Sequence, residues 1–254
     1  MPSKELAAAV SAARAAAEVI NAYYRRNPSV RIKPDHSPVT EADVRAEQVI
    51  RATLAREFPG YGFYGEETGQ HAMQAESIWL VDPLDGTKSF VRETPFFSTQ
   101  IALMRAGELV LGVSNAPAYD ELAWAERGAG AYLNDRRIRV SEVATLEQAF
   151  YSFGNLKSLT QAPHWARLGQ VFARGARVRG YGDFVHYHLL ARGSVDVVIE
   201  SDVNILDVAA LAVLVREAGG AFTDLQGAAV GLGTTSVLAS NARLHPKVLA
   251  ALKP

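Results

Sequence analysis

The stretch from Ile78 to Phe90 constrains the possible folds of this chain more than any other segment. Four apolar residues, beginning at Ile78, run directly into Asp82 and Asp85, and Gly86 follows. Such an apolar run predicts a buried strand that brings both carboxylates to its carboxyl end. Carboxylates this close repel each other unless a cation lies between them, and the backbone amides that follow are free to hold an anion. The segment therefore indicates a hard divalent metal beside a phosphate.

Each acidic residue also has an ordinary explanation when it is taken alone. The Asp82–Asp85 segment has good turn chemistry, although the apolar strand before it argues for a buried approach. Glu66 and Glu67 fit a solvated loop, Asp207 fits a helix N-cap, and Asp43 fits a first-turn helix acid. The combination is more informative, because three separate segments each place carboxylates at the end of a predicted element.

Composition narrows the class of protein. A chain of 254 residues suits one large α/β domain or two small ones. The net charge of −1 gives no broad basic surface for nucleic acid, and the absence of cysteine excludes disulfides, thiolate metal sites and cysteine nucleophiles. No apolar run is long enough to span a bilayer, and charges interrupt the alanine-rich N-terminus, which indicates a helix and not a signal peptide. We expect a cytoplasmic protein without a membrane or nucleic-acid partner.

The two halves of the chain differ in pattern. Helices are expected over 3–26 and 40–57, followed by a mainly antiparallel sheet that includes a hairpin of segments 99–105 and 109–116. The second half alternates strands with helices, which indicates a layered α/β arrangement. Its expected helices cover 160–174, 183–191 and 207–218. We therefore predict an α/β (α+β) fold in which residues 1–145 form an N-terminal region that carries most metal ligands, and residues 146–254 form a C-terminal region that completes one catalytic unit.

Three signature segments resemble those of the inositol monophosphatase superfamily, which contains lithium-sensitive, magnesium-dependent phosphatases. They are Gly65-Glu66-Glu67, Asp82-Pro83-Leu84-Asp85-Gly86-Thr87, and Asp207-Val208-Ala209-Ala210 followed by Glu217-Ala218-Gly219-Gly220. The segment Arg179-Gly180-Tyr181-Gly182-Asp183-Phe184 looks most similar to the histidinol-phosphate phosphatase branch. The resemblance implies a layered α-β-α-β-α sandwich of the inositol monophosphatase and fructose-1,6-bisphosphatase type, and a homodimer.

The resemblance also implies roles for individual residues. Glu66, Asp82 and the carbonyl of Leu84 would hold one Mg²⁺, and Asp82, Asp85 and Asp207 a second, with a weaker third ion near Glu66. The implied catalytic residues are Glu66, Thr87 and Asp43, with Thr87 bonded towards Asp43 to orient the attacking water. The backbone around Gly86, Thr87 and Lys88 would bind the phosphate.

The leaving group is expected to contact Asp183 and Glu200. Inositol-type relatives usually carry a small or hydroxyl residue at the Asp183 position, whereas a carboxylate suits an ammonium or imidazolium group. A helix cap would be the ordinary role of Asp183, and a surface acid at a strand end that of Glu200. Leu206 replaces the tryptophan of many relatives, which bears on substrate fit. His186 and His188 lie two apart in a predicted helix and so point to different faces, which argues against a shared metal.

The leading hypothesis is a magnesium-dependent phosphomonoesterase that converts L-histidinol phosphate to L-histidinol in histidine biosynthesis. An inositol-1-monophosphatase or a phosphatase of broad specificity for small phosphates is the nearest alternative, and an enzyme that cleaves 3′-phosphoadenosine phosphates is another. A different class of function, an inactive regulatory homologue, is disfavoured by the intact set of acids.

Overall fold

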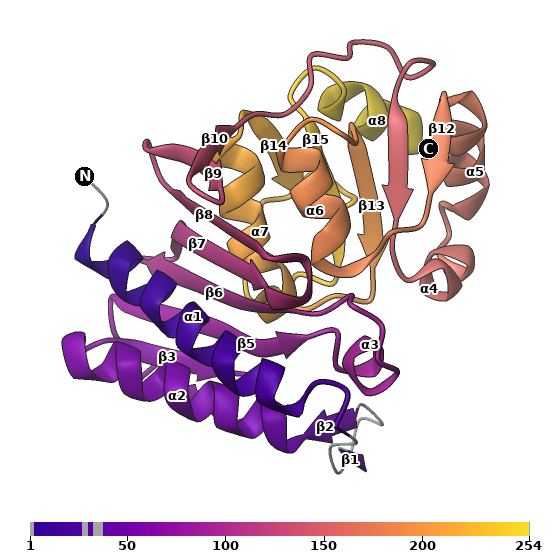
Figure 1. Cartoon of the computed structure of the whole chain (residues 1–254). Helices are drawn as coiled ribbons and strands as arrows, with labels where there is room; N and C mark the ends of the chain where they lie inside the picture. Colours follow the sequence, from indigo (N-terminus) through magenta and orange to yellow (C-terminus); the bar gives the residue numbers. More distant parts are fainter. Residues whose placement is uncertain (1–2, 27–29, 33–37, 254) are drawn as a thin grey trace.

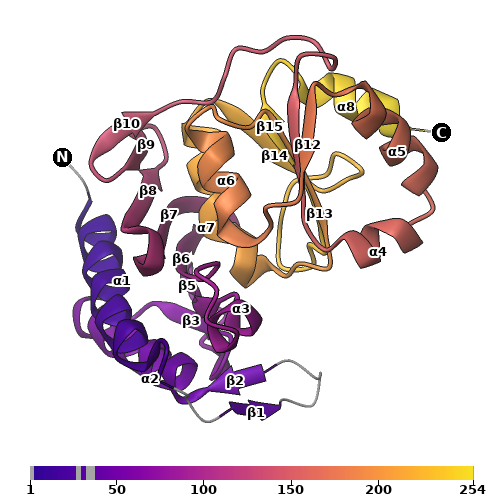
Figure 2. The ribbon, with the colours of Figure 1, turned by 45° about the vertical axis from the view of Figure 1, so that its right-hand side comes forward.

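The computed structural model describes residues 3–26, 30–32 and 38–253. Helices and two sheets alternate in five layers, as Figures 1 and 2 show. Two N-terminal helices cover one face of the larger sheet, two helices lie between the sheets, and three helices of the second half cover the outer face of the smaller sheet. The short helix over 87–91 packs into the same core as the two N-terminal helices. This is the expected α-β-α-β-α sandwich. The α-helices are α1 (Lys4–Tyr23), α2 (Glu41–Glu57), α3 (Thr87–Val91), α4 (Leu156–Gln161), α5 (Trp165–Arg174), α6 (Asp183–Ala191), α7 (Ile205–Glu217) and α8 (His245–Leu252).

The larger sheet has eight strands in the order β10-β9-β8-β7-β6-β5-β3-β4. Adjacent strands in this sheet run antiparallel, except for β3 and β5, which run parallel to each other. The hairpin expected around Ala106-Gly107 is confirmed by the pairing of β6 with β7. The strands are β3 (Gly62–Gly65), β4 (Gly69–His71), β5 (Ser77–Asp85), β6 (Ser98–Arg105), β7 (Glu108–Ala116), β8 (Glu121–Glu126), β9 (Gly130–Leu133) and β10 (Arg136–Ile138), with the 3-10 turn η1 (Pro117–Tyr119) between β7 and β8.

The smaller sheet has five strands in the order β12-β11-β13-β15-β14. Strand β11 is parallel to both of its neighbours, and the remaining pairs are antiparallel. The strands are β11 (Phe150–Phe153), β12 (Arg177–Arg179), β13 (Val197–Ser201), β14 (Gly220–Thr223) and β15 (Ser236–Asn241). A separate two-stranded ribbon pairs β1 (Val30–Ile32) with β2 (Pro38–Thr40).

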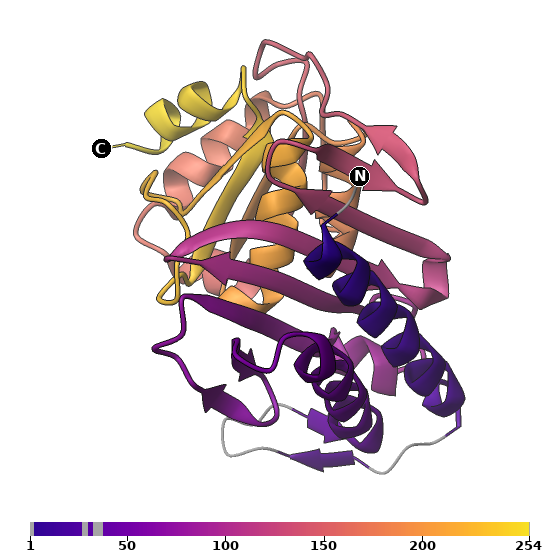
Figure 3. The same ribbon diagram turned by 90° about the vertical axis from the view of Figure 1, so that its left-hand side faces the viewer.

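The apolar pattern of each helix explains its layer. Helix α1 buries a stripe of small side chains with Leu6 and Ile20 against α2 and the larger sheet (Figure 3). Helix α7 is apolar on every side, with Leu206, Leu211 and Leu214 all buried, as expected for a helix that lies between two sheets. Because α7 is fixed on both sides, its N-terminal end has a defined position beside the end of β5.

Three sequence expectations require correction or stay untested. The helix expected over 160–174 is two helices, α4 and α5, because Pro163 interrupts the pattern and cannot continue a helix. The helix expected over 3–26 ends earlier, at Tyr23. The division of the chain near residue 145 stays a prediction, although the passage from the larger to the smaller sheet occurs between β10 and β11. Among the helices of the described ranges, none is both long and apolar enough to cross a bilayer.

Candidate active site

Three aspartates from two distant segments meet at one end of the larger sheet. Strand β5 supplies Asp82 and Asp85, and the first turn of α7 supplies Asp207. One carboxylate oxygen from each lies within 4.8 Å of the others. A register shift in the pairing of β5 with β6 falls between Asp82 and Asp85, and this irregularity allows both side chains to approach α7.

The charges of these aspartates are mutually unfavourable in the absence of a cation. Burial, followed by the nearby charges of Glu66, Asp85 and Asp207, raises the pKa of Asp82 well above its ordinary value. Burial likewise raises the pKa of Asp85 well above normal, with Asp183 and Asp207 adding to the effect. The pKa of Asp207 is raised to about 7, mainly by burial. Such a cluster is stable as a set of carboxylates only if a cation compensates it.

Asp207 is not the N-cap of its helix, contrary to the ordinary explanation for an acid at that position. The N-cap of α7 is Asn204, whose side chain accepts a hydrogen bond from the amide of Leu206 at 2.7 Å. Asp207 closes the capping box, because its two oxygens accept from the backbone amide (2.9 Å) and the side-chain amide (2.8 Å) of Asn204. These bonds fix the carboxylate in the orientation in which it faces Asp82 and Asp85.

Glu66 follows β3 directly and lines the same cavity as the three aspartates. Its amide donates to the carbonyl of Val81 at 3.1 Å, which ties this segment to β5. Sequence reasoning missed the residue that supports this loop, the fully buried Glu47. The Glu47 carboxylate accepts the amides of Glu67 and Thr68, both at 2.8 Å. Its signal in the sequence was its position one helical turn after Asp43, on the same face of α2.

Asp43 and Thr87 are in contact, as the resemblance implied. The Thr87 hydroxyl lies 2.8 Å from Asp43 Oδ1 and 3.0 Å from the carbonyl of Leu84. Thr40, the N-cap of α2, donates to Asp43 Oδ2 through its amide (2.7 Å) and its hydroxyl (2.6 Å). Burial raises the pKa of Asp43, and the hydrogen bonds from Thr40 and Thr87 act against that increase. A hydroxyl that donates to Asp43 has its lone pairs left to accept a hydrogen bond from water.

The segment after Asp85 turns sharply into the short helix α3. Gly86 has φ of 89°, and a Cβ atom there would lie 2.3 Å from the carbonyl oxygen of Phe96. Glycine is therefore required both for the backbone conformation and for the close passage of the Phe96 backbone. The amides of Thr87 and Lys88 belong to the first turn of α3, where amides have no partner within a helix.

Glu66, the three aspartates and the segment from Gly86 to Lys88 line one cavity of about 370 Å³, and Asp183 and Glu200 line it as well. Asp183 is the first residue of α6 and has φ of 47°, while Gly182 is the N-cap, so the cap explanation for Asp183 is wrong. Burial, then the charge of Glu200, raises the pKa of Asp183 to about 6. Glu200 is only 4% exposed, so the surface explanation for it is wrong too. Asp202 and Asn204 lie along the same wall.

Two neighbours of Glu200 were also missed from the sequence, Tyr187 and His186. The Tyr187 hydroxyl and the His186 ring both contact the Glu200 carboxylate. His186 and His188 point to different faces of α6, as expected, with His188 directed towards Glu121 and Ser114.

Comparison with known proteins agrees with this geometry. The profile of the inositol monophosphatase family matches residues 1–254. The chain belongs to this family. It is 43% identical to a histidinol-phosphatase of Mycobacterium tuberculosis, over 87% of this chain and 86% of the relative. It is 37% identical to an inositol-1-monophosphatase of Mesorhizobium japonicum, over 90% and 87% of the two chains. The crystal structure of the suhB protein of Bartonella henselae superposes with a TM-score of 0.89 at 34% identity, covering 99% of both chains.

Membership of this family makes the chain a phosphatase, that is, a phosphoric monoester hydrolase. Enzymes of this family are typically metal-dependent, and the cluster of Asp82, Asp85 and Asp207 fits that requirement. The donors are carboxylate oxygens, the ligand type that hard cations such as Mg²⁺ prefer. Burial and mutual repulsion raise the pKa values of all three aspartates, and a bound cation would relieve both effects.

Proposed function

We propose that this phosphatase hydrolyses L-histidinol phosphate to L-histidinol, a step of histidine biosynthesis, with two Mg²⁺ ions and a weaker third. The observation that carries the choice of substrate is the acidic wall formed by Asp183 and Glu200, which line the same cavity as the proposed metal and phosphate ligands. Histidinol carries an ammonium group and an imidazole, and both can pair with carboxylates. Inositol offers only hydroxyl groups, for which two closely spaced acids are a less specific match.

The proposed metal ligands are Glu66, Asp82, Asp85, Asp207 and the carbonyl oxygen of Leu84. Bound among these oxygens, Mg²⁺ would lower the pKa of a water ligand and neutralise charge on the phosphoryl oxygens. The Leu84 amide donates to Asp82 Oδ1 at 2.9 Å, which fixes that carboxylate within the turn. Glu47 holds the loop of Glu66 through two backbone amides.

The remaining steps belong to the protein's own groups. Thr87, kept in place by Asp43, would accept a hydrogen bond from the attacking water and orient it, beside Glu66. The backbone of Gly86, Thr87 and Lys88 would hold the phosphoryl oxygens and stabilise the charge that develops on them. Lys88 lines the same cavity, and its positive charge acts to lower the pKa of Asp183. Asp183 and Glu200 would hold the leaving group in line with the attack.

The relatives include enzymes named for the proposed activity and enzymes named for its nearest alternative. Histidinol-phosphatases of Mycobacterium tuberculosis and of Streptomyces coelicolor are 43% and 39% identical to the chain. The inositol-1-monophosphatase of Mesorhizobium japonicum is 37% identical to the chain, so sequence identity hardly separates the two activities. The decision therefore depends on the acidic wall. The cytoplasmic location and the homodimer expected from the sequence stay predictions.

A side-by-side assay tests the proposal. The purified protein is supplied with L-histidinol phosphate, inositol 1-phosphate or 3′-phosphoadenosine 5′-phosphate, each with Mg²⁺ and with a chelator in its place. We expect kcat/KM for histidinol phosphate to exceed the others at least tenfold, and chelation to abolish turnover. Comparable turnover of histidinol phosphate and inositol 1-phosphate would reject the substrate assignment, and no turnover of any ester with Mg²⁺ would favour an inactive homologue.

A further inference from the structure

Two buried side chains of α6 hold one oxygen of Glu200. The Tyr187 hydroxyl donates to Glu200 Oε2 at 2.7 Å, and His186 Nε2 lies 3.1 Å from the same oxygen. Tyr187 is 1% exposed and His186 is fully buried. A carboxylate can only accept hydrogen bonds, so His186 must carry its proton on Nε2 when Glu200 is ionised. Both contacts therefore restrain Oε2 and leave Oε1 as the oxygen that can contact a ligand.

The other side of the His186 ring supports this assignment. His186 Nδ1 lies 3.3 Å from the hydroxyl of Ser152, and that hydroxyl accepts the amide of Tyr181 at 3.3 Å. A neutral imidazole protonated on Nε2 has an acceptor at Nδ1. The chain of donors then runs in one direction, from the Tyr181 amide through Ser152 and His186 to Glu200. Every hydrogen bond in this series therefore forms with a neutral imidazole and an ionised carboxylate.

A glycine provides the space for Glu200 Oε1. A Cβ atom at Gly154 would lie 1.9 Å from Oε1 and 2.6 Å from the carboxyl carbon. Any side chain at position 154 would thus displace the carboxylate from its place in the cavity wall. Gly154 directly follows β11, the parallel neighbour of β13, on which Glu200 lies. The backbone and the two donors together define one orientation of Glu200.

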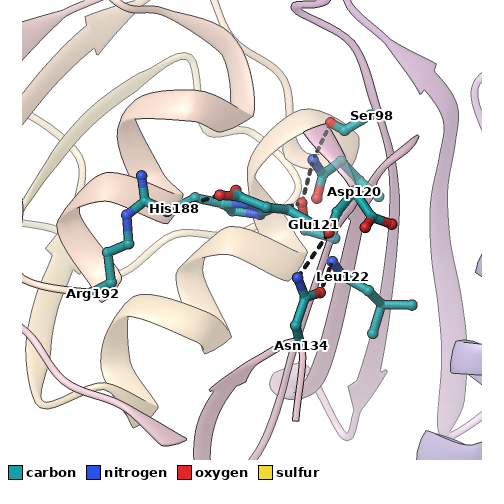
Figure 4. A network of polar contacts seen from close by, with 9 residues as sticks. Ser98, Asp120, Glu121, Leu122, Asn134, His188 and Arg192 are labelled. Atoms are coloured by element: carbon teal, nitrogen blue, oxygen red, sulfur yellow. Dashed lines mark hydrogen bonds and ion pairs between the residues drawn. The ribbon is translucent and has the colours of Figure 1, made fainter. Parts of the chain in front are cut away.

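The opposite face of α6 is held to the larger sheet by contacts that do not involve Glu200. His188 contacts Glu121 Oε2 through Nδ1 and Ser114 Oγ through Nε2, both at 2.9 Å. Arg192 binds the other oxygen of Glu121 at 2.8 Å. Glu121 and Ser114 belong to the larger sheet, and the network continues along that sheet to Ser98 (Figure 4). Because these contacts anchor α6 without Glu200, removing one hydroxyl from the Glu200 side should leave the helix in place.

We propose that Tyr187 and His186 are positioning residues that act through Glu200, and that this orientation selects phosphate esters whose leaving group carries an ammonium. The inference deepens the proposed function and rests on it for the identity of the substrate. A side chain that merely filled the core would affect all substrates alike. A side chain that acts through Glu200 affects only those whose leaving group pairs with that carboxylate.

The test compares Tyr187→Phe with the wild type on L-histidinol phosphate and on phenyl phosphate, whose leaving group has no cation. We expect a five- to twentyfold loss of kcat/KM on histidinol phosphate, mostly through KM, and at most about a threefold loss on phenyl phosphate. Tyr151→Phe is the matched control, because Tyr151 is an equally buried tyrosine whose hydroxyl donates to the Leu146 carbonyl, away from the cavity wall. Tyr151→Phe should change kcat/KM by no more than about twofold on either substrate.

A double-mutant cycle separates positioning from packing. In a Glu200→Gln background, Tyr187→Phe should lower kcat/KM for histidinol phosphate no more than about twofold further. Ser152→Ala, which leaves Tyr187 intact, should reproduce the substrate-dependent pattern with a two- to fivefold loss. Equal losses on both esters, or losses that multiply in the Glu200→Gln background, would overturn the inference. A wild type that prefers inositol 1-phosphate would reject the proposed substrate and, with it, the selection for an ammonium. Non-additive losses from Tyr187→Phe and Glu200→Gln on that ester would still show that Tyr187 acts through Glu200.

Discussion

Neutralising Asp85 should stabilise the metal-free protein and remove its response to Mg²⁺. The ligand oxygens of Asp82, Asp85 and Asp207 lie within 4.8 Å of one another. At that separation two unit charges repel by about 1 kcal/mol in water and by about 3.5 kcal/mol at an effective dielectric constant near 20. Asp85 has two such neighbours, but its raised pKa means that protonation already relieves part of the repulsion. We therefore expect Asp85→Asn to raise the free energy of unfolding by about 1 to 3 kcal/mol without metal.

The assay is thermal unfolding of the wild type and the variant, each in chelator and in saturating Mg²⁺. The expected gain corresponds to an increase in Tm of several degrees for a chain of this size, at about 2–4 °C per kcal/mol. A ligand at one hundred times its Kd stabilises by about 2.7 kcal/mol, so Mg²⁺ should raise the Tm of the wild type and have a much smaller effect on the variant. Turnover should be lost.

The matched control is Asp135→Asn, which removes the same charge from an exposed turn between β9 and β10. It should leave the Tm, the Mg²⁺ response and turnover unchanged within error. If Asp85→Asn were no more stable than the wild type in chelator and kept the full Mg²⁺ response, the three carboxylates would not form the proposed cluster. Near-normal turnover of the variant would lead to the same conclusion.

The same geometry gives three more expectations. Asp183→Asn should lower kcat/KM for histidinol phosphate by about 10- to 100-fold and kcat/KM for phenyl phosphate far less, because only the first ester has an ammonium that can pair with a carboxylate. Steady-state kinetics on both esters measure this difference, and equal losses would refute a leaving-group role for Asp183. Thr87→Val should lower kcat by about 10- to 100-fold with a smaller change in KM, because the contact with Asp43 that orients the water is lost; an unchanged kcat would contradict it. Stability of the metal-free protein should fall as the pH rises from about 4 to about 7, because the pKa values of Asp183 and Asp207 are raised to about 6 and about 7, so the folded state binds more protons in that range. Denaturant unfolding measures this slope, and saturating Mg²⁺ should flatten it.

The features of the fold that could be predicted from sequence were those with a local cause. The apolar run before Asp82 predicts β5, and Thr40 with Asp43 predicts the capping box that begins α2. The apolar run after Asp207 predicts the long helix α7. The error over 160–174 also had a local signal, since Pro163 cannot occupy a helix interior.

The features that could not be predicted depend on contacts between distant segments. The spacing of Glu47 from Asp43 indicates only that both lie on one face of α2, and it does not indicate that the Glu47 carboxylate accepts amides 20 and 21 residues away. Tyr187 and His186 lie in an apolar helix, and their roles are visible only when α6 packs beside β13. The resemblance to a family supplied the proposed ligand set. The physical reason for proposing it, three carboxylates in one cavity, became visible only in the fold.

The most direct test of the central claim is a crystal soaked with Mn²⁺ and measured at a wavelength at which manganese scatters anomalously. The account predicts an anomalous peak at coordination distance, about 2.0–2.3 Å, from oxygens of Asp82, Asp85 and Asp207. A peak elsewhere, or none at this cluster in a crystal in which Mn²⁺ supports turnover, would contradict the account.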